Sequence, residues 1–172
     1  DAVIKFFNEV VAIAQQRDLL SGEHFSVDGT LIQAWAGHKS FVPKTEKADD
    51  ADQSDGDGSG GNAAGDFKGQ RRSNETHQSK TDGDARLYRK GNTASELRYM
   101  GHTLSDNRHG LIANAMVTKA DGYAEREAAK AMINDARQAL GDDAREITLG
   151  ADKGYDAKEF IDACDAMKVT PH

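Results

Sequence analysis

Two short apolar runs, each followed or ended by an aspartate, constrain the fold of this chain more than any other feature. The first run is His24–Thr30, in which apolar and polar residues alternate and which contains Asp28. The second is Ile147–Ala151, directly before Asp152. Runs of this length and composition are typical of β-strands. Because carboxylates on neighbouring strands can hold a divalent metal against a phosphodiester, the pair predicts metal-assisted phosphoryl transfer.

The periodicity of the remaining chain predicts an α/β (α+β) fold, with a mixed sheet flanked by helices. We expect helices at 2–16, 124–140 and after Asp156, and further strands at 97–104, 111–118 and from Val169. A strand, an insertion, a two-strand hairpin and then alternating helices and strands indicate such a sheet. If the first and fourth strands are neighbours, Asp28 and Asp152 come within reach of one metal ion.

Local signals refine this outline. Asp156 is the expected N-cap of the following helix, with Glu159 three residues later as in a capping box, and Gly141 is the expected C-cap of the preceding helix. Trp35 is expected to pack near the sheet. From spacing alone, the simpler interpretation of the two aspartates is that Asp28 begins a turn and Asp152 caps a strand end.

Residues 43–96 form a long insertion whose charge changes sign. The stretch 48–66 holds six aspartates and five glycines without a basic residue, which predicts a disordered or mobile segment. The following stretch is basic, and its cations are candidate contacts for DNA phosphates. The DNA-binding candidates are Lys68, Arg71, Arg72, Arg86, Arg89 and Lys90, together with Lys153 beside the second aspartate. A solvated loop whose cations balance the aspartates explains the same pattern equally well.

Length and composition set further bounds. The chain has 172 residues and a formal net charge of −7, which suits one domain without a basic footprint over its whole surface. Its single cysteine, Cys164, indicates a reducing compartment. There is no apolar run of membrane-spanning length, so we expect no membrane partner and a cytoplasmic protein. The ends at Asp1 and His172 indicate a fragment truncated at both ends.

Several separate motifs, in order along the chain, resemble the bacterial IS5-type transposases of the IS4-like DDE superfamily. These motifs are 24–32, 66–77, 84–90, 99–102, 107–112 and 151–156. The resemblance implies an RNase H-like fold with a DDE metal site. It assigns residues 1–22 to the tail of an N-terminal helical region and residues 23–172 to a partial catalytic domain, which includes the flexible 43–96 insertion.

The resemblance also implies the chemistry. Asp28 matches the first aspartate of the family and Asp152 the second, as catalytic residues and as ligands of Mg²⁺ (or Mn²⁺). The expected third residue, a glutamate, has no match here and should lie beyond His172. His102 and His109 have no partner pair for zinc and are expected to be structural. Tyr155 and Lys153 could contact a phosphate, although core packing and solvation explain them as well.

The leading hypothesis is therefore a fragment of a DNA transposase catalytic domain, which cleaves insertion-sequence ends and transfers the strands to target DNA. Its expected partner is double-stranded DNA, with a possible homodimer in the full-length protein, in the bacterial cytoplasm at the nucleoid. Two alternatives stay open. One is a catalytically inactive DNA-binding remnant that lacks the third acidic residue, and the other is an RNase H-like metal nuclease.

Overall fold

The computed structural model describes residues 2–44, 66–67, 70–140 and 146–172, without the side chains of 66–71 and Leu140. The chain divides into two compact units. The sheet unit comprises Asp1–Thr30, Met100–Thr118 and Gly122–His172, and the insertion unit comprises Leu31–Tyr99 and Lys119–Asp121. Strands β1 (His24–Gln33) and β7 (Glu96–Asp106) contribute residues to both units.

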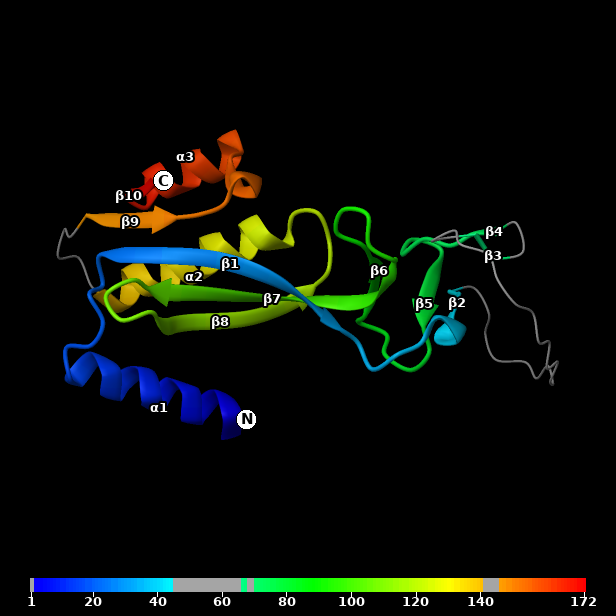
Figure 1. The fold of residues 1–172 in the computed structure, drawn as a ribbon, viewed down its shortest axis with the longest axis horizontal. Helices are drawn as coiled ribbons and strands as arrows, with labels where there is room; N and C mark the ends of the chain where they lie inside the picture. The colour runs from blue at the N-terminus through cyan, green and yellow to red at the C-terminus, as the bar shows by residue number, and fades with distance from the viewer. Residues whose placement is uncertain (1, 45–65, 68–69, 141–145) are drawn as a thin grey trace. The chain divides into compact units, whose positions relative to one another are not determined.

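The sheet unit is built on a mixed β-sheet (Figure 1). Its strands follow the order β10-β9-β1-β7, and β8 pairs with β7. The additional strands are β8 (Leu111–Lys119), β9 (Ile147–Gly150) and β10 (Val169–Pro171). Strand β9 runs parallel to both β1 and β10, whereas β7 runs in the opposite direction to β1 in Figure 1. The predicted mixed sheet is confirmed, and the first and fourth predicted strands, β1 and β9, are direct neighbours.

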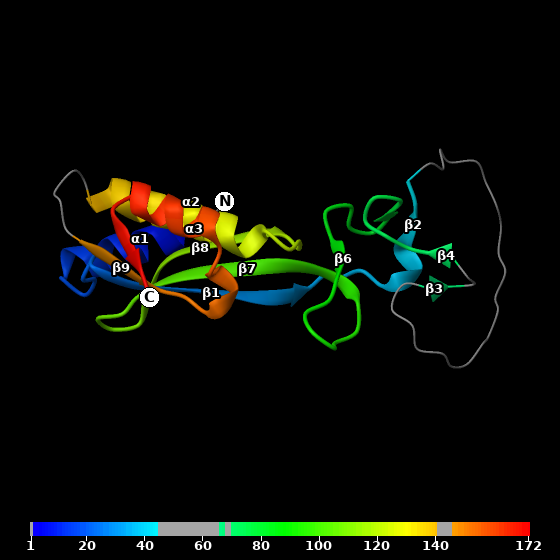
Figure 2. The same cartoon turned by 90° about the horizontal axis from the view of Figure 1, so that it is seen from above.

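Helices α2 (Ala124–Leu140) and α3 (Lys158–Ala166) lie together along one face of this sheet (Figure 2). They bury an apolar core against the inward face of β1, which carries Phe25 and Val27. The other buried members of this core are Leu104, Ala129, Met132, Ile133, Ile147, Leu149, Tyr155, Phe160, Cys164 and Val169. Burying each large side chain stabilises the fold by about 1.5–3 kcal/mol, so this cluster is the main source of stability of the sheet unit.

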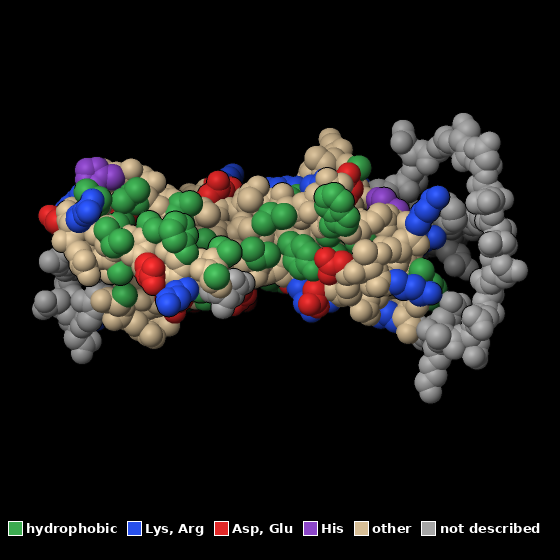
Figure 3. Space-filling view, turned by 90° about the horizontal axis from the view of Figure 1, so that it is seen from below, with side chains coloured by type: hydrophobic (Ala, Val, Ile, Leu, Met, Phe, Trp, Pro, Cys, Tyr) green, Lys and Arg blue, Asp and Glu red, His purple; other side chains and the backbone are tan. Residues whose placement is uncertain are grey.

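Helix α1 (Ala2–Gln16) has the predicted apolar stripe but buries little of it. Ala14 is its buried residue, whereas Val3 and Phe6 are 73% and 68% exposed. Hydrophobic side chains accordingly reach the surface in the left half of Figure 3, where α1 lies. None of the helices in the described ranges is long and apolar enough to cross a membrane.

The predicted capping box at α3 is wrong. The helix begins at Lys158 and its N-cap is Ala157, which makes no side-chain capping bond. Asp156 instead ends a 3₁₀ turn, η2 (Lys153–Tyr155), because its backbone N–H donates to the carbonyl of Lys153. The short turn after β9 therefore occupies the residue that the sequence pattern assigned to the helix cap. Gly141, the expected C-cap of α2, lies outside the described residues.

In its described part, the insertion unit consists of short strands that pair two by two and do not form a large sheet covered by helices. Strand β2 (Phe41–Pro43) pairs antiparallel with β5 (His77–Ser79), β3 (Asp66–Phe67) pairs with β4 (Gln70–Arg71), and β6 (Arg86–Tyr88) pairs with the start of β7. A 3₁₀ turn, η1 (His38–Ser40), precedes β2. The small core consists of Ala34, Phe41, Ala85 and Leu97.

The insertion is thus more structured in its basic half than its composition suggests. Residues 72–96 contain two of these strands, and His77, Ser79 and Ala85 are buried. Most of the acidic half, for which disorder is predicted, lies outside the described residues.

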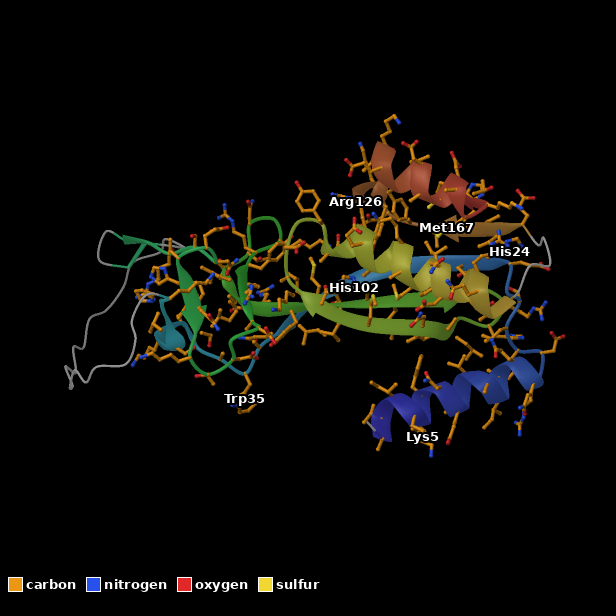
Figure 4. The ribbon with its side chains drawn as sticks, turned by 180° about the vertical axis from the view of Figure 1, so that it is seen from behind. Lys5, His24, Trp35, His102, Arg126 and Met167 are labelled. Carbon is orange, nitrogen blue, oxygen red and sulfur yellow. The ribbon has the colours of Figure 1, made fainter. Side chains whose placement is uncertain are left out.

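The expectation that Trp35 packs near the sheet is wrong, since this side chain is 97% exposed. Ala34 is the buried residue of this stretch, and its N–H donates to the carbonyl of Leu97 at 2.9 Å. Trp35 lies in a bend after the end of β1, and its side chain points outward (Figure 4).

Candidate metal centre

The parallel pairing of β1 and β9 places Asp28 and Asp152 at corresponding positions. The register joins His24 to Thr148, Phe25 to Leu149 and Ser26 to Gly150. Asp28 lies two residues after Ser26, and Asp152 lies two residues after Gly150. Neighbouring strands are about 4.8 Å apart, and alternate residues share a face of the sheet. Both aspartates therefore lie two residues beyond the last paired residues of these neighbouring strands, at the same end of the paired region.

Each aspartate is exposed and has one carboxylate oxygen engaged locally. Oδ1 of Asp28 accepts from the backbone N–H of Gly29 at 2.8 Å, and Oδ1 of Asp152 accepts from that of Gly154 at 2.7 Å. Asp152 is thus the N-cap of η2, as the simpler interpretation expected, whereas Asp28 lies within β1 and not in a turn. These bonds fix the orientation of both carboxylates and leave their second oxygens for another partner.

Two buried polar atoms in this unit have no hydrogen-bond partner within the described part of the chain. They are the hydroxyl of Tyr155, whose side chain is 3% exposed, and Nδ1 of His102, which is 1% exposed. Burial raises the pKa of the Tyr155 phenol, and the charges of Glu125, Asp152 and Asp28 raise that pKa further.

His102 lies on β7, as Figure 4 shows, and its other ring nitrogen, Nε2, is 2.7 Å from Oγ1 of Thr118. Burial lowers the pKa of its imidazole, and the charge of Glu125 opposes this shift only in part. The ring is therefore neutral at pH 7. The expected structural role of His102 agrees with its burial between strands.

The first turn of α2 brings two residues to this place that the sequence pattern did not single out. Arg126 donates through Nη1 to the carbonyl of Gly154 at 3.3 Å (Figure 4). Oε1 of Glu125 lies 2.9 Å from the position that a Cβ on Gly29 would occupy. Acidic residues in a first helical turn are common because they complement the helix dipole. That common pattern carried no signal that Glu125 would lie against Gly29, the residue after Asp28.

The donor chemistry of the pair fits a hard cation such as Mg²⁺, which prefers carboxylate oxygens. Among the residues that the structure describes, however, no group of three or more His, Cys, Asp or Glu side chains is arranged to hold a metal ion. Asp28 and Asp152 are thus a fitting but partial ligand set.

The side chains of the predicted DNA contacts differ in how far they are available to a partner. Lys68 and the side chain of Arg71 lie outside the described residues. Arg86 is turned inward, since its Nη1 donates to the carbonyls of Gly83 and Ala85 at 2.9 and 3.1 Å. Arg72 is half-buried and its Nη1 donates to the carbonyl of His38 at 3.4 Å.

Three further candidates are exposed. Arg89 and Lys90 follow β6 directly in the insertion unit, and Lys153 follows Asp152 in the sheet unit. Exposed cations of this kind can contact a phosphate backbone without changing the fold around them.

A mixed sheet with helices packed on it agrees with the RNase H-like fold that the sequence motifs implied, and both aspartates lie just past the paired region of two adjacent parallel strands. The sequence model of the family described as "Transposase DDE domain" matches residues 21–172. The chain therefore belongs to the transposase DDE domain family, a class that depends on a divalent metal. The finer assignment to the IS5 type is not established by this match.

Solved structures give distant similarities. One is described as the "Crystal structure of a pre-cleavage Mos1 transpososome", with a TM-score of 0.41 and 11% identity over 95% of this chain and 39% of that chain. Another, "Mos1 transposase paired-end complex with left transposon end", has a TM-score of 0.41 and 10% identity, with 95% and 38% covered. The chain thus spans about two fifths of their length. No curated protein sequence matches it significantly.

Proposed function

We propose that this chain is part of the catalytic domain of a DNA transposase, in which Asp28 and Asp152 hold a divalent cation, Mg²⁺ or Mn²⁺, against the DNA strand to be cleaved. The observation that supports this most strongly is the β1–β9 register, which aligns the two aspartates of a chain that belongs to the transposase DDE domain family. The expected reaction is hydrolysis at the insertion-sequence ends, followed by transfer of the strand to target DNA.

The chain's own residues would orient the reaction. The bound cation supplies charge for the attacking and leaving oxygens. The N–H groups of Gly29 and Gly154 hold one oxygen of each aspartate, so the second oxygens stay directed away from the local backbone. Preorganised carboxylates need no rearrangement when the phosphodiester arrives, which is the main advantage of such a site.

Double-stranded DNA is the proposed partner. We propose that the full-length protein acts at the nucleoid in the bacterial cytoplasm and forms a homodimer. The net charge of −7 means that DNA must bind at local cations rather than over the whole surface. Lys153 lies next to the candidate metal ligand, and Arg89 and Lys90 are exposed in the insertion unit. Lys68, Arg71 and Arg72 also remain proposed DNA contacts, although no exposed side chain of theirs is described. Arg86 is better explained by its hydrogen bonds to the carbonyls of Gly83 and Ala85 within the insertion unit.

A nicking assay tests this proposal. Supercoiled plasmid is incubated with the chain and Mn²⁺, and the fraction of open-circular DNA is measured for the wild type, Asp28→Asn and Asp152→Asn. We expect cation-dependent nicking by the wild type that either substitution lowers by at least about 100-fold. Nicking that survives both substitutions would show that the activity has another source.

A second candidate function is a DNA-binding remnant without catalysis. It is favoured by the finding that no group of three ligating side chains is arranged for a metal within the described ranges. The same assay, paired with DNA binding, separates the two. Trp35 is the single tryptophan and is 97% exposed, so quenching of its fluorescence offers a direct binding readout. Binding without nicking at any Mn²⁺ concentration would favour the remnant.

A further inference from the structure

The apolar face of helix α1 is wider than the part that its own unit covers. On the covered part, Phe7 and Val11 are half-buried and line a cavity of about 670 Å³ together with Phe25 of β1 and Ala136 of α2. Ala14, three residues after Val11, is buried. A surface helix normally turns its whole apolar face towards a core, so the remaining part of this face calls for a partner.

The exposed part of the face is a stripe with the spacing of a coiled coil. It consists of Val3, Phe6, Val10 and Ile13, which are between 47% and 73% exposed. Intervals of three, four and three residues keep these side chains in one row along the helix, as at the a and d positions of a heptad repeat. Hydrophobic side chains gather on the surface where α1 lies (Figure 3). A row of this kind marks a surface for packing against another helix.

The spacing of the α1 stripe is the same from either end of the helix, so the stripe is complementary to a copy of itself. In an antiparallel pair, Val3 of one copy lies opposite Ile13 of the other, and Phe6 lies opposite Val10. Each layer then combines a larger side chain with a valine, which fills the space between the helices without placing two bulky groups together. A two-fold axis relates the two copies, as in most homodimers.

The charges beside the stripe favour the antiparallel direction. Lys5 and Glu9 are exposed, and each directly precedes a residue of the stripe, so both flank the same edge of it. Lys5 lies on the side of α1 that points away from the strands (Figure 4). In an antiparallel pair this edge meets the same edge of the other copy, which brings Lys5 of one copy near Glu9 of the other. In a parallel pair it would meet the opposite edge, with Ala14, which offers no charge.

We propose that the stripe of Val3, Phe6, Val10 and Ile13 binds α1 of a second copy of this chain in the antiparallel direction. The inference rests on the homodimer that is part of the proposed function, and it adds the surface that forms this dimer. Four residues from each copy make a small interface, so the dimer should dissociate on dilution.

Sedimentation equilibrium of the full chain, without DNA or cation, tests the inference at concentrations up to about 1 mM, where weak contacts are still populated. We expect a concentration-dependent dimer. Phe6→Asp places one carboxylate from each copy in the interface and should weaken dimerisation at least about 100-fold. Val117→Asp on β8 is the matched control and should leave dimerisation unchanged, since Val117 is nearly as exposed as Phe6. Melting curves followed by circular dichroism confirm that each variant is folded.

Charge reversal tests the antiparallel direction. Lys5→Glu and Glu9→Lys each leave two like charges on the edge of the stripe, so each variant alone should dimerise on the order of tenfold more weakly than the wild type. An equimolar mixture of the two variants brings opposite charges together across an antiparallel interface and should associate more tightly than either variant alone. A change in the stability of the helix itself does not explain such a gain, because mixing leaves both helices unchanged.

The outcomes are distinct from those of the proposed catalytic function. A wild type that is monomeric at every concentration, or a dimer that Phe6→Asp leaves intact, would overturn the inference. A mixture that associates no more tightly than its components would contradict the antiparallel pairing. A dimer without cation-dependent nicking would support the inference and count against the catalytic function, whereas nicking by a monomeric chain would do the reverse.

Discussion

The two units of this chain are stabilised by different means. In the sheet unit, a mixed sheet and two helices enclose an apolar core in which Phe160, Leu149 and Met132 are fully buried. In the insertion unit, the apolar cluster is small and polar bridges link the short strands. Asn74, for example, exchanges two hydrogen bonds with the backbone of Leu87, and Tyr99 donates to Asp82 at 2.5 Å.

This difference in stabilisation indicates which unit is better suited to hold catalytic side chains in fixed positions. A carboxylate on a strand that is fixed by a large core keeps its position when a charged substrate arrives. Segments fixed by a few hydrogen bonds open more easily, because each bond contributes only about 1 kcal/mol. The candidate metal ligands lie in the first kind of unit, and most of the candidate DNA contacts lie in the second, where adjustment to a partner costs less.

The largest effect should come from the core of the sheet unit. Leu149→Ala removes a fully buried side chain from β9, the strand between β1 and β10. We expect a loss of about 2–5 kcal/mol in the free energy of unfolding, measured by urea denaturation. Val117→Ala on β8 is the control, since Val117 is 63% exposed. Equal losses for the two variants would contradict the assigned core.

A polar anchor within the apolar unit should rank next. Asp106 is fully buried, and its Oδ2 accepts from the N–H groups of Ser21 and Gly22 and from the Ser21 hydroxyl. Asp106→Asn places an amide against these donors, and we expect a cost of about 2–3 kcal/mol. A cost near zero in urea denaturation would show that this contact does not hold the start of β1.

The same carboxyl predicts a pH dependence. Burial alone would raise the pKa of Asp106, but bonds from Gly22, Arg108 and Ser21 outweigh it and hold the pKa below the ordinary value of 3.8. A lowered pKa in the folded state stabilises the protein above the unfolded-state pKa, and this contribution is lost as the pH falls through the folded-state value. Wild type should therefore lose stability below about pH 4 more steeply than Asp106→Asn.

A smaller effect, confined to the insertion unit, is expected for Asn74→Ala. This change removes both bonds to Leu87, which measure 2.8 and 3.0 Å. We expect a local cost of about 1–2 kcal/mol, seen as faster amide hydrogen exchange in the strands β5 and β6. Exchange in β1 and β9 should stay unchanged, and acceleration there would mean that the two units are stabilised together.

The smallest effect is expected for the single bond of Tyr99. Its burial raises the pKa of the phenol to about 12, and the hydrogen bond to Asp82 adds to this. Tyr99→Phe should cost about 0.5–1.5 kcal/mol. In a spectrophotometric titration, one tyrosine that ionises near pH 12 in the wild type should be missing from the variant. A wild-type titration without such a component would contradict the bond.

The sequence predicted the sheet unit well because its elements repeat with clear periods. The alternation in β1 and the apolar run of β9 were enough to identify both strands, and the hairpin between them fixed the mixed sheet. The order of elements left the pairing of β1 with β9 as a condition for a shared site, and the structure meets that condition.

Other features could not be predicted because they depend on tertiary contacts. Residues 72–96 are held in a defined structure by hydrogen bonds such as those between Asn74 and the backbone of Leu87. The polar composition of this stretch does not indicate which residues form such bonds. Trp35 is exposed in a bend after β1, whereas large aromatic residues are more often buried. Glu125 reaches Gly29 only because α2 packs on this face of the sheet, and its position in a first helical turn has an ordinary explanation.

The most direct test of the central claim is a count of bound Mn²⁺ by electron paramagnetic resonance for the wild type, Asp28→Asn, Asp152→Asn and the double variant. If both aspartates hold one cation, each single substitution should abolish binding, and the double variant should be no worse than either. Such non-additivity is the mark of groups that share one interaction. If each single variant instead retains half of the bound Mn²⁺, the two aspartates bind separate ions and the account of a shared metal centre is wrong.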